Sequence, residues 1–132
     1  MLKIAKFSFY LFGINTYVVY DTEAREAAII DPGMTRPEEF DAMERFIMRE
    51  NLTVTHLINT HLHVDHAIAD QWVKRKYNVA VNAHPLEREL GKMMTMQGDA
   101  FGVNGVEGPV EIEKELKDGD IIRIGEGELE VI

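Results

Sequence analysis

The sequence predicts an α/β fold in which strands and helices form layers. Short β-prone segments open the chain, segments with apolar residues at helical spacing follow, and the two kinds then alternate. The chain has 132 residues, of which 45% are hydrophobic and 28% charged, which suits one compact core. No internal repeat or composition shift marks a boundary between domains.

The first third of the chain is expected to form strands. Residues 3–11 are rich in aromatic and aliphatic side chains, and a turn at 13–15 leads into the β-prone segment 16–20. Residues 27–30 are wholly apolar and stop at Asp31-Pro32-Gly33, which is a turn signal. Taken alone, Asp31 is therefore interpreted as a turn residue.

A helix is expected next. Thr35 is a good N-cap, Glu38 completes a capping box with it, and Pro37 is tolerated in the first turn. The predicted buried face holds four apolar residues: Phe40, Met43, Phe46 and Ile47. The helix should end near residues 50–51, and residues 53–59 should resume as a buried strand.

The rest of the chain continues the alternation. A helix is expected over 67–77, a short strand over 79–81, and a third helix from Pro85. Residues 97–109 include four glycines and are expected to form a long loop. Two further strands are expected at 121–124 and 129–132, joined by a turn.

Composition and charge exclude several classes of protein. The formal net charge is −9, and an acidic surface repels phosphate backbones and anionic lipid, so no nucleic-acid and no membrane partner is expected. The chain has no cysteine, which excludes disulfides, thiolate metal sites and cysteine nucleophiles. No signal-peptide pattern or membrane-spanning stretch is present, so a cytoplasmic protein is expected.

Four potential metal ligands stand together after the strand expected at 53–59. They are His61, His63, Asp65 and His66, and such a density of nitrogen and oxygen donors is typical of a divalent metal site. Residues i and i+2 of an extended segment point the same way, so His61 and His63 can face one metal. Asp65 and His66 are adjacent and project away from that pair, which favours two metals roughly 3.5–4 Å apart.

A plainer interpretation of the same residues is that they are structural. Asp65 stands where the N-cap of the following helix is expected, and the three histidines would then be surface polar groups. The density of the whole cluster argues against this interpretation. His56 and His84 are isolated beside strands, and each is expected to be structural.

At residues 61–66 the chain resembles the metallo-β-lactamase superfamily, whose HxHxDH signature it matches at every defined position. Supporting segments occur in the family's order: Asn15-Thr16-Tyr17, the strand ending at Asp31-Pro32-Gly33, and Asp118-Gly119-Asp120. Within the superfamily, the chain is most similar to glyoxalase II-like hydrolases. The resemblance implies a partial αββα sandwich, with residues 1–132 as the N-terminal portion of a single domain.

The resemblance also implies a metal-dependent hydrolase with two metals. His61 and His63 would bind the first metal, and Asp65 and His66 the second, with zinc expected and iron or manganese as alternatives. Asp65 would also orient a hydroxide that attacks the ester or thioester carbonyl of a small-molecule substrate. Asp31 would support the site by hydrogen bonds.

The family's pattern is only partly present. Ala67-Ile68-Ala69 stands where a Gly pair is common, and the family's later His, Asp and His ligands do not follow residues 128–132. We therefore expect two protein ligands per metal, an uncovered face on the first sheet and an open edge at 129–132.

Two functions remain open on this basis. A hydrolase would need further residues or a second chain for full activity, so self-association or completion by another chain is expected. The alternative is a truncated, non-catalytic module that binds metal or dimerises. A nuclease of the same superfamily is disfavoured, because the chain has 23 acidic residues against 14 Lys and Arg.

Overall fold

The computed structural model describes all 132 residues and contains a six-stranded sheet and a separate two-stranded hairpin. The large sheet has the strand order β1 (Leu2–Ser8), β2 (Asn15–Asp21), β3 (Glu26–Ile30), β4 (Thr53–Ile58), β5 (Val81–Ala83), β6 (Lys114–Glu115). Strands β1 to β3 pair antiparallel, and β3 to β6 pair parallel. The predicted α/β class is confirmed.

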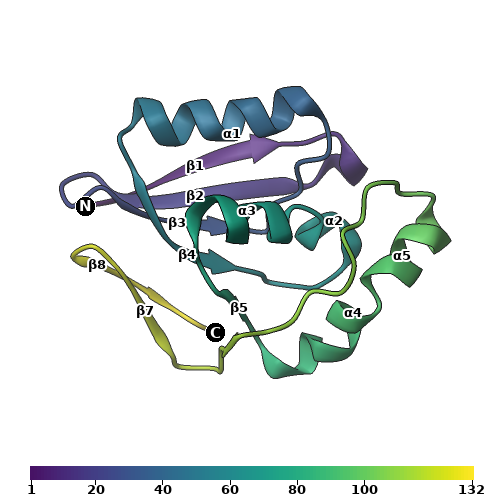
Figure 1. The fold of residues 1–132 in the computed structure, drawn as a ribbon. Coiled ribbons are helices and arrows are strands. Elements are labelled where there is room, and N and C mark those ends of the chain that lie inside the picture. The colour runs from purple at the N-terminus through teal and green to yellow at the C-terminus, as the bar shows by residue number, and fades with distance from the viewer.

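The helices cover this sheet on one face and at one end (Figure 1). They are α1 (Pro37–Arg49), α2 (Val64–Ala67), α3 (Asp70–Tyr77), α4 (Arg88–Lys92) and α5 (Met94–Phe101), with short 3-10 turns at Leu11–Gly13 and Pro85–Glu87. None of these helices combines the length and the apolar character that crossing a membrane requires. In Figure 1, α5 and the hairpin lie at opposite sides of the view.

Two apolar clusters lie on opposite faces of the sheet. The larger has 23 buried residues and joins the helices to side chains such as Ile29 and Leu57. The smaller consists of Ala28, Ile58, Leu116, Ile122 and Ile124, and lies under the hairpin formed by β7 (Ile121–Ile124) and β8 (Gly127–Glu130). Neighbouring strand residues point to opposite faces, which is why Ala28 and Ile29 join different clusters. The face that we expected to be uncovered is therefore partly covered by this hairpin.

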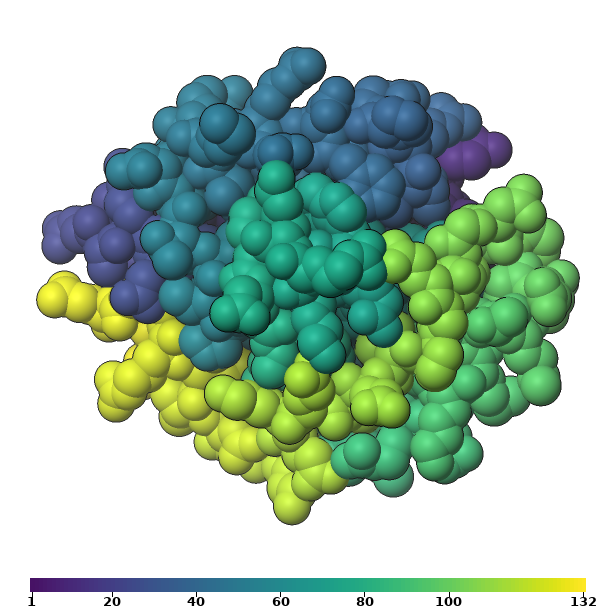
Figure 2. Space-filling model, in the orientation of Figure 1, coloured from purple at the N-terminus to yellow at the C-terminus, as the bar shows by residue number.

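The hairpin is also held at its turn by polar contacts. Asp21, at the end of β2, accepts a hydrogen bond from the Glu126 backbone N–H at 2.7 Å, and Glu26 accepts one from Gly125 at 3.2 Å. Hydrogen bonds from the backbone of Glu23 and Glu126 lower the pKa of Asp21 to about 2. Figure 2 shows the hairpin packed beside the segment that follows β2.

The cap of α1 differs from the prediction by one residue. Arg36 is the N-cap, and Glu39 rather than Glu38 is the acidic partner. The Glu39 carboxylate accepts hydrogen bonds from the backbone of Thr35, Arg36 and Tyr10. Burial raises the pKa of Glu39, but these hydrogen bonds outweigh it and the net pKa is lowered. The hydrogen bond from the Tyr10 N–H is a tertiary contact, and it accounts for Glu39 rather than Glu38 being the acidic partner.

The bounds of several other helices and strands also differ from the prediction. The helix expected over 67–77 is two helices, because the backbone N–H of Ala69 donates to Pro32 O at 3.1 Å instead of continuing a helical ladder. The strand expected over 79–81 lies at Val81–Ala83, and the last strand lies at Gly127–Glu130. The expected loop at 97–109 begins only after Phe101, because α5 occupies its first five residues.

Candidate metal centre

The histidine-rich motif forms the loop that leaves β4 and enters α2. Leu62 and Val64 are buried in the main core, whereas His61 and His63 between them are exposed. This alternation places the two imidazoles on the same side of the loop. The ring centroids of His61 and His63 are 5.7 Å apart, and that of His66 lies 5.3 Å from His61 and 6.4 Å from His63. The three rings therefore gather in one small region.

Asp65 lies beside His66 with its carboxylate free of any capping role. Asp65 Oδ2 is 3.8 Å from His66 Nε2, and the two side chains are 21% and 24% exposed. Helix α2 begins at Val64 with His63 as its N-cap, so the expectation that Asp65 would be the cap is wrong. No three His, Asp or Glu side chains of the chain are arranged closely enough to hold one ion as they stand. The structure does not divide the four donors into two pairs, because the His61 ring lies nearer to that of His66 than to that of His63.

Asp31 lies directly behind His66. Its carboxylate is buried and accepts the backbone N–H of Thr60 at 2.7 Å, while Oδ2 accepts the Thr60 hydroxyl and the His66 Nδ1–H, the latter at 3.0 Å. A proton on Nδ1 leaves the lone pair on His66 Nε2, the ring nitrogen that faces Asp65. A buried carboxylate in this position fixes both the tautomer and the orientation of a metal-binding histidine.

The turn that carries Asp31 is held by Thr16 of β2. The Thr16 hydroxyl donates to Asp31 O at 2.7 Å and accepts the Gly33 N–H at 3.1 Å. Asp31 itself has a φ of 53°, a left-handed conformation that Asp adopts more readily than bulky residues. A Cβ on Gly33 would lie 2.8 Å from Asp65 O, so only glycine fits between the turn and the motif.

Two side chains that sequence reasoning missed hold the backbone of the motif. Gln97 of α5 accepts the Val64 N–H at 2.9 Å and donates to Leu62 O at 3.1 Å. Glu87 accepts the Leu62 N–H at 2.9 Å. The sequence pattern predicts a loop at Gln97, and the signal that indicates a helix instead is its helical spacing from Met94, which is buried.

A second missed pair lies beneath His66. The Asn59 Nδ2 amide donates to His66 O and to Asp70 Oδ1, both at 3.1 Å. Asp70 is fully buried, and burial raises its pKa well above the usual range, with the negative charge of Asp31 adding to the effect and the Asn59 hydrogen bond opposing it. Asn59 therefore connects the motif to the start of α3.

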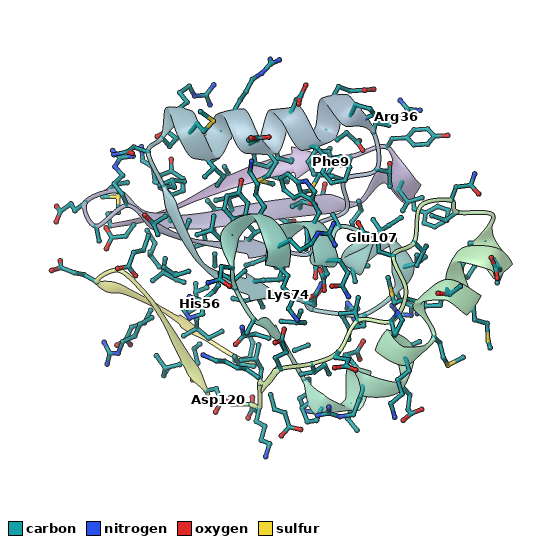
Figure 3. All side chains as sticks on the ribbon, in the orientation of Figure 1. Phe9, Arg36, His56, Lys74, Glu107 and Asp120 are labelled. Atoms are coloured by element: carbon teal, nitrogen blue, oxygen red, sulfur yellow. The ribbon has the colours of Figure 1, made fainter.

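The two other histidines do not join the cluster. His56 lies near the hairpin (Figure 3), and its pKa is lowered by burial and by the charge of Lys114, with Glu26 opposing. His84 Nδ1 accepts the Leu86 N–H at 3.1 Å, a local capping contact. His84 and His61 both line a cavity of about 720 Å³ between the sheet and the hairpin.

The donor chemistry of the cluster fits a divalent transition metal. Three imidazoles and one carboxylate are ligand types that zinc and iron accept, and one of the imidazoles already has a buried carboxylate behind it. These features define an α/β protein with a cluster of candidate metal ligands at the carboxyl end of a parallel strand. The chain belongs to the metallo-beta-lactamase superfamily, whose family model matches residues 10–132.

The chain is also similar to individual proteins. An uncharacterized protein from Aquifex aeolicus (strain VF5) is 31% identical over 119 residues, which cover 90% of this chain and 53% of that protein. A hydroxyacylglutathione hydrolase from Synechococcus sp. is 31% identical over 74 residues, which cover 55% of this chain and 27% of the enzyme.

A solved structure shows the same fold. The structure described as TTHA1623 in a di-iron-bound form superposes with a TM-score of 0.72 at 24% identity, and the match covers 88% of this chain and 55% of that one. The chain thus spans about half the length of that structure and of the Aquifex aeolicus relative.

Proposed function

We propose that this chain supplies the metal-binding part of a hydrolase that cleaves an ester or thioester bond in a small-molecule substrate. The observation that carries the proposal is the hydrogen bond from His66 Nδ1 to the buried Asp31, in a loop where His61 and His63 face the same region. The name of the Synechococcus relative, a hydroxyacylglutathione hydrolase, supports this reaction type. The di-iron title of the structural relative supports a site for two metals.

Five side chains would take part in the proposed reaction. His61 and His63 would hold one metal, and Asp65 with His66 Nε2 would hold the other. When bound, such metals supply Lewis acidity to the carbonyl oxygen and generate a strong nucleophile from water at neutral pH. Asp65 would orient the attacking oxygen, and Asp31 would keep His66 in the binding tautomer. Water adds to the carbonyl carbon, the C–O or C–S bond breaks, and a carboxylic acid and an alcohol or thiol are released.

Metal analysis tests the ligand assignment. Purified protein titrated with Zn²⁺, Fe²⁺ or Mn²⁺ is expected to bind about two equivalents, as two-metal sites do. His66→Ala should lose the second equivalent, whereas the matched variant His56→Ala should retain both, since His56 lies near the hairpin. Less than half an equivalent in folded protein contradicts the assignment.

A non-catalytic, metal-binding or dimerising module is the second candidate. Two protein ligands per metal is the feature that favours it, because a catalytic zinc normally has three. Turnover of a thioester that His61→Ala abolishes would reject this candidate.

We also propose that the site is completed by further residues or by a second chain, since the chain spans 53% of its Aquifex aeolicus relative. A light-scattering mass of a single 132-residue chain together with full metal occupancy and activity would contradict completion.

A further inference from the structure

Two cavities meet beside the candidate metal centre. The first, of about 360 Å³, is lined by His63, Asp65 and His66 of the motif, together with Val64, Gln97 and two phenylalanines. The second, of about 540 Å³, is lined mainly by apolar residues of the loop after β1 and of the segment after α5. Phe12 and Phe101 line both cavities, so these two rings separate the candidate metal centre from the second cavity, whose lining is both polar and apolar.

The two phenylalanines form an exposed aromatic pair. Phe12 is 59% exposed and Phe101 is 62% exposed, so most of the surface of each residue lies outside the core. Their centroids are 6.1 Å apart with an interplanar angle of 78°, an edge-to-face contact between residues far apart in the sequence. Phe12 also has a φ of 54°, a left-handed backbone that bulky side chains rarely adopt. Exposed apolar surface of this kind beside a site commonly marks a ligand contact.

Both rings are fixed relative to the metal-binding motif. Phe12 lies between Leu11 and Ile14, which are both buried in the main core. Phe101 is the last residue of α5, the helix whose Gln97 hydrogen-bonds the backbone of Leu62 and Val64. The distance from the aromatic pair to the motif is therefore set by the core and by hydrogen bonds.

The adjacent cavity is suited to an uncharged group. Its lining includes Tyr10, Leu11 and Val103, with Thr35 and Asn104 as neutral polar residues and no acidic or basic side chain. The guanidinium of Arg36 lies 3.6 Å from the ring centroid of Tyr10, outside this lining. Figure 3 shows Arg36 at the start of α1. An acyl group with an aromatic ring or a branched alkyl chain can contact the apolar part of these walls, whereas a carboxylate would find no cationic side chain in the lining.

We infer that Phe12 and Phe101 are specificity-determining residues that contact an aromatic or branched apolar acyl group of the substrate while its carbonyl lies at the metal centre. This inference rests on the proposed hydrolase function. It names the substrate class as esters or thioesters of bulky, uncharged acids.

Kinetics on a matched pair of substrates tests the inference. The metal-loaded, full-length protein is assayed with phenylacetyl and acetyl thioesters of the same thiol. Wild-type protein should prefer the phenylacetyl substrate, and Phe12→Ala or Phe101→Ala should reduce that preference in kcat/KM by about 10-fold or more. Leu86→Ala is the matched control, because Leu86 is exposed but lines neither cavity. Emission from Trp72 checks folding, and Phe12→Asn, which tolerates a left-handed backbone, replaces any alanine variant that unfolds.

A binding measurement separates this inference from the proposed function. Saturation-transfer NMR with the non-hydrolysable S-phenethyl thioether reports contact without catalysis. Binding that Phe12→Ala removes, with no hydrolysis of either substrate, supports the aromatic site and overturns the hydrolase proposal. Hydrolysis without a phenylacetyl preference, or with equal losses for both substrates, overturns the aromatic site alone. Neither hydrolysis nor binding overturns both.

Discussion

Asp70→Asn is expected to stabilise the protein at neutral pH, although it alters a fully buried side chain. The Asp70 carboxylate receives one hydrogen bond, from Asn59 Nδ2 at 3.1 Å. Its other oxygen, Oδ2, and the Asn59 side-chain oxygen are both buried without a partner. When Asp70 is ionised, these two acceptors have no donor, which is costly inside a protein, whereas a side-chain amide at position 70 brings a donor at every pH.

The expected gain follows from the cost of one orphaned buried group, about 1–3 kcal/mol. For a domain of this size, about 1 kcal/mol corresponds to a rise in Tm of roughly 3–5 °C. Because burial raises the pKa of Asp70 in the folded state, the folded protein holds this proton more tightly than the unfolded chain does. Wild-type stability from this group is therefore full below the unfolded pKa of about 3.9 and falls as the pH rises toward the folded pKa. The asparagine variant lacks this slope, so its advantage should grow with pH.

Urea denaturation monitored by Trp72 emission, at pH values from about 4 to about 8, measures the free energy of unfolding of each protein and its dependence on pH. Asp41→Asn is the matched control, because Asp41 is exposed on α1 and should change stability little. An Asp70→Asn protein that is less stable than wild type at the upper pH, or that keeps the wild-type pH slope, would refute the reasoning.

Three further outcomes are expected. Asp31→Asn should weaken metal binding about 10–100-fold, as measured by competition with a chelator, because His66 loses its anionic partner; an unchanged affinity would count against this role for Asp31. Gln97→Ala should cost about 2–4 kcal/mol in urea unfolding, because it leaves backbone groups of the motif without partners; a loss below about 0.5 kcal/mol would contradict the assignment. The hairpin attachment through Asp21 should be present above the unfolded pKa of about 3.9 and should weaken as the pH falls toward about 2, the folded value. Hydrogen exchange of the hairpin amides should show this acid weakening in wild type and not in Asp21→Asn, and identical profiles would argue against it.

Local patterns predicted the elements that carry the donors. The apolar run before Asp31 and the β-prone segment before Asn59 identified β3 and β4, because buried parallel strands have few polar residues. The i, i+2 spacing of His61 and His63 indicated that they face the same side, since the loop is extended and alternates with buried residues.

Such local patterns could not predict contacts between segments that are far apart in the sequence. Gln97 and Asp70 have roles only because α5 and α3 pack against the motif, and helical spacing alone does not indicate which backbone groups an inward polar residue will meet. The split between α2 and α3 depends on one hydrogen bond from Ala69 to Pro32, a residue of the loop that follows β3. The covering of the second sheet face likewise depends on how the hairpin folds back, and no short-range signal encodes that path.

The hydrogen bonds of Gln97 to the backbone of Leu62 and Val64 have a practical consequence for protein engineering. Transplanting the six-residue histidine signature into another scaffold would move the ligands without the hydrogen bonds that set their spacing. A graft that keeps its shape must bring residues 85–101 and the turn at Asp31 as well, so the smallest portable unit of this centre is discontinuous in sequence.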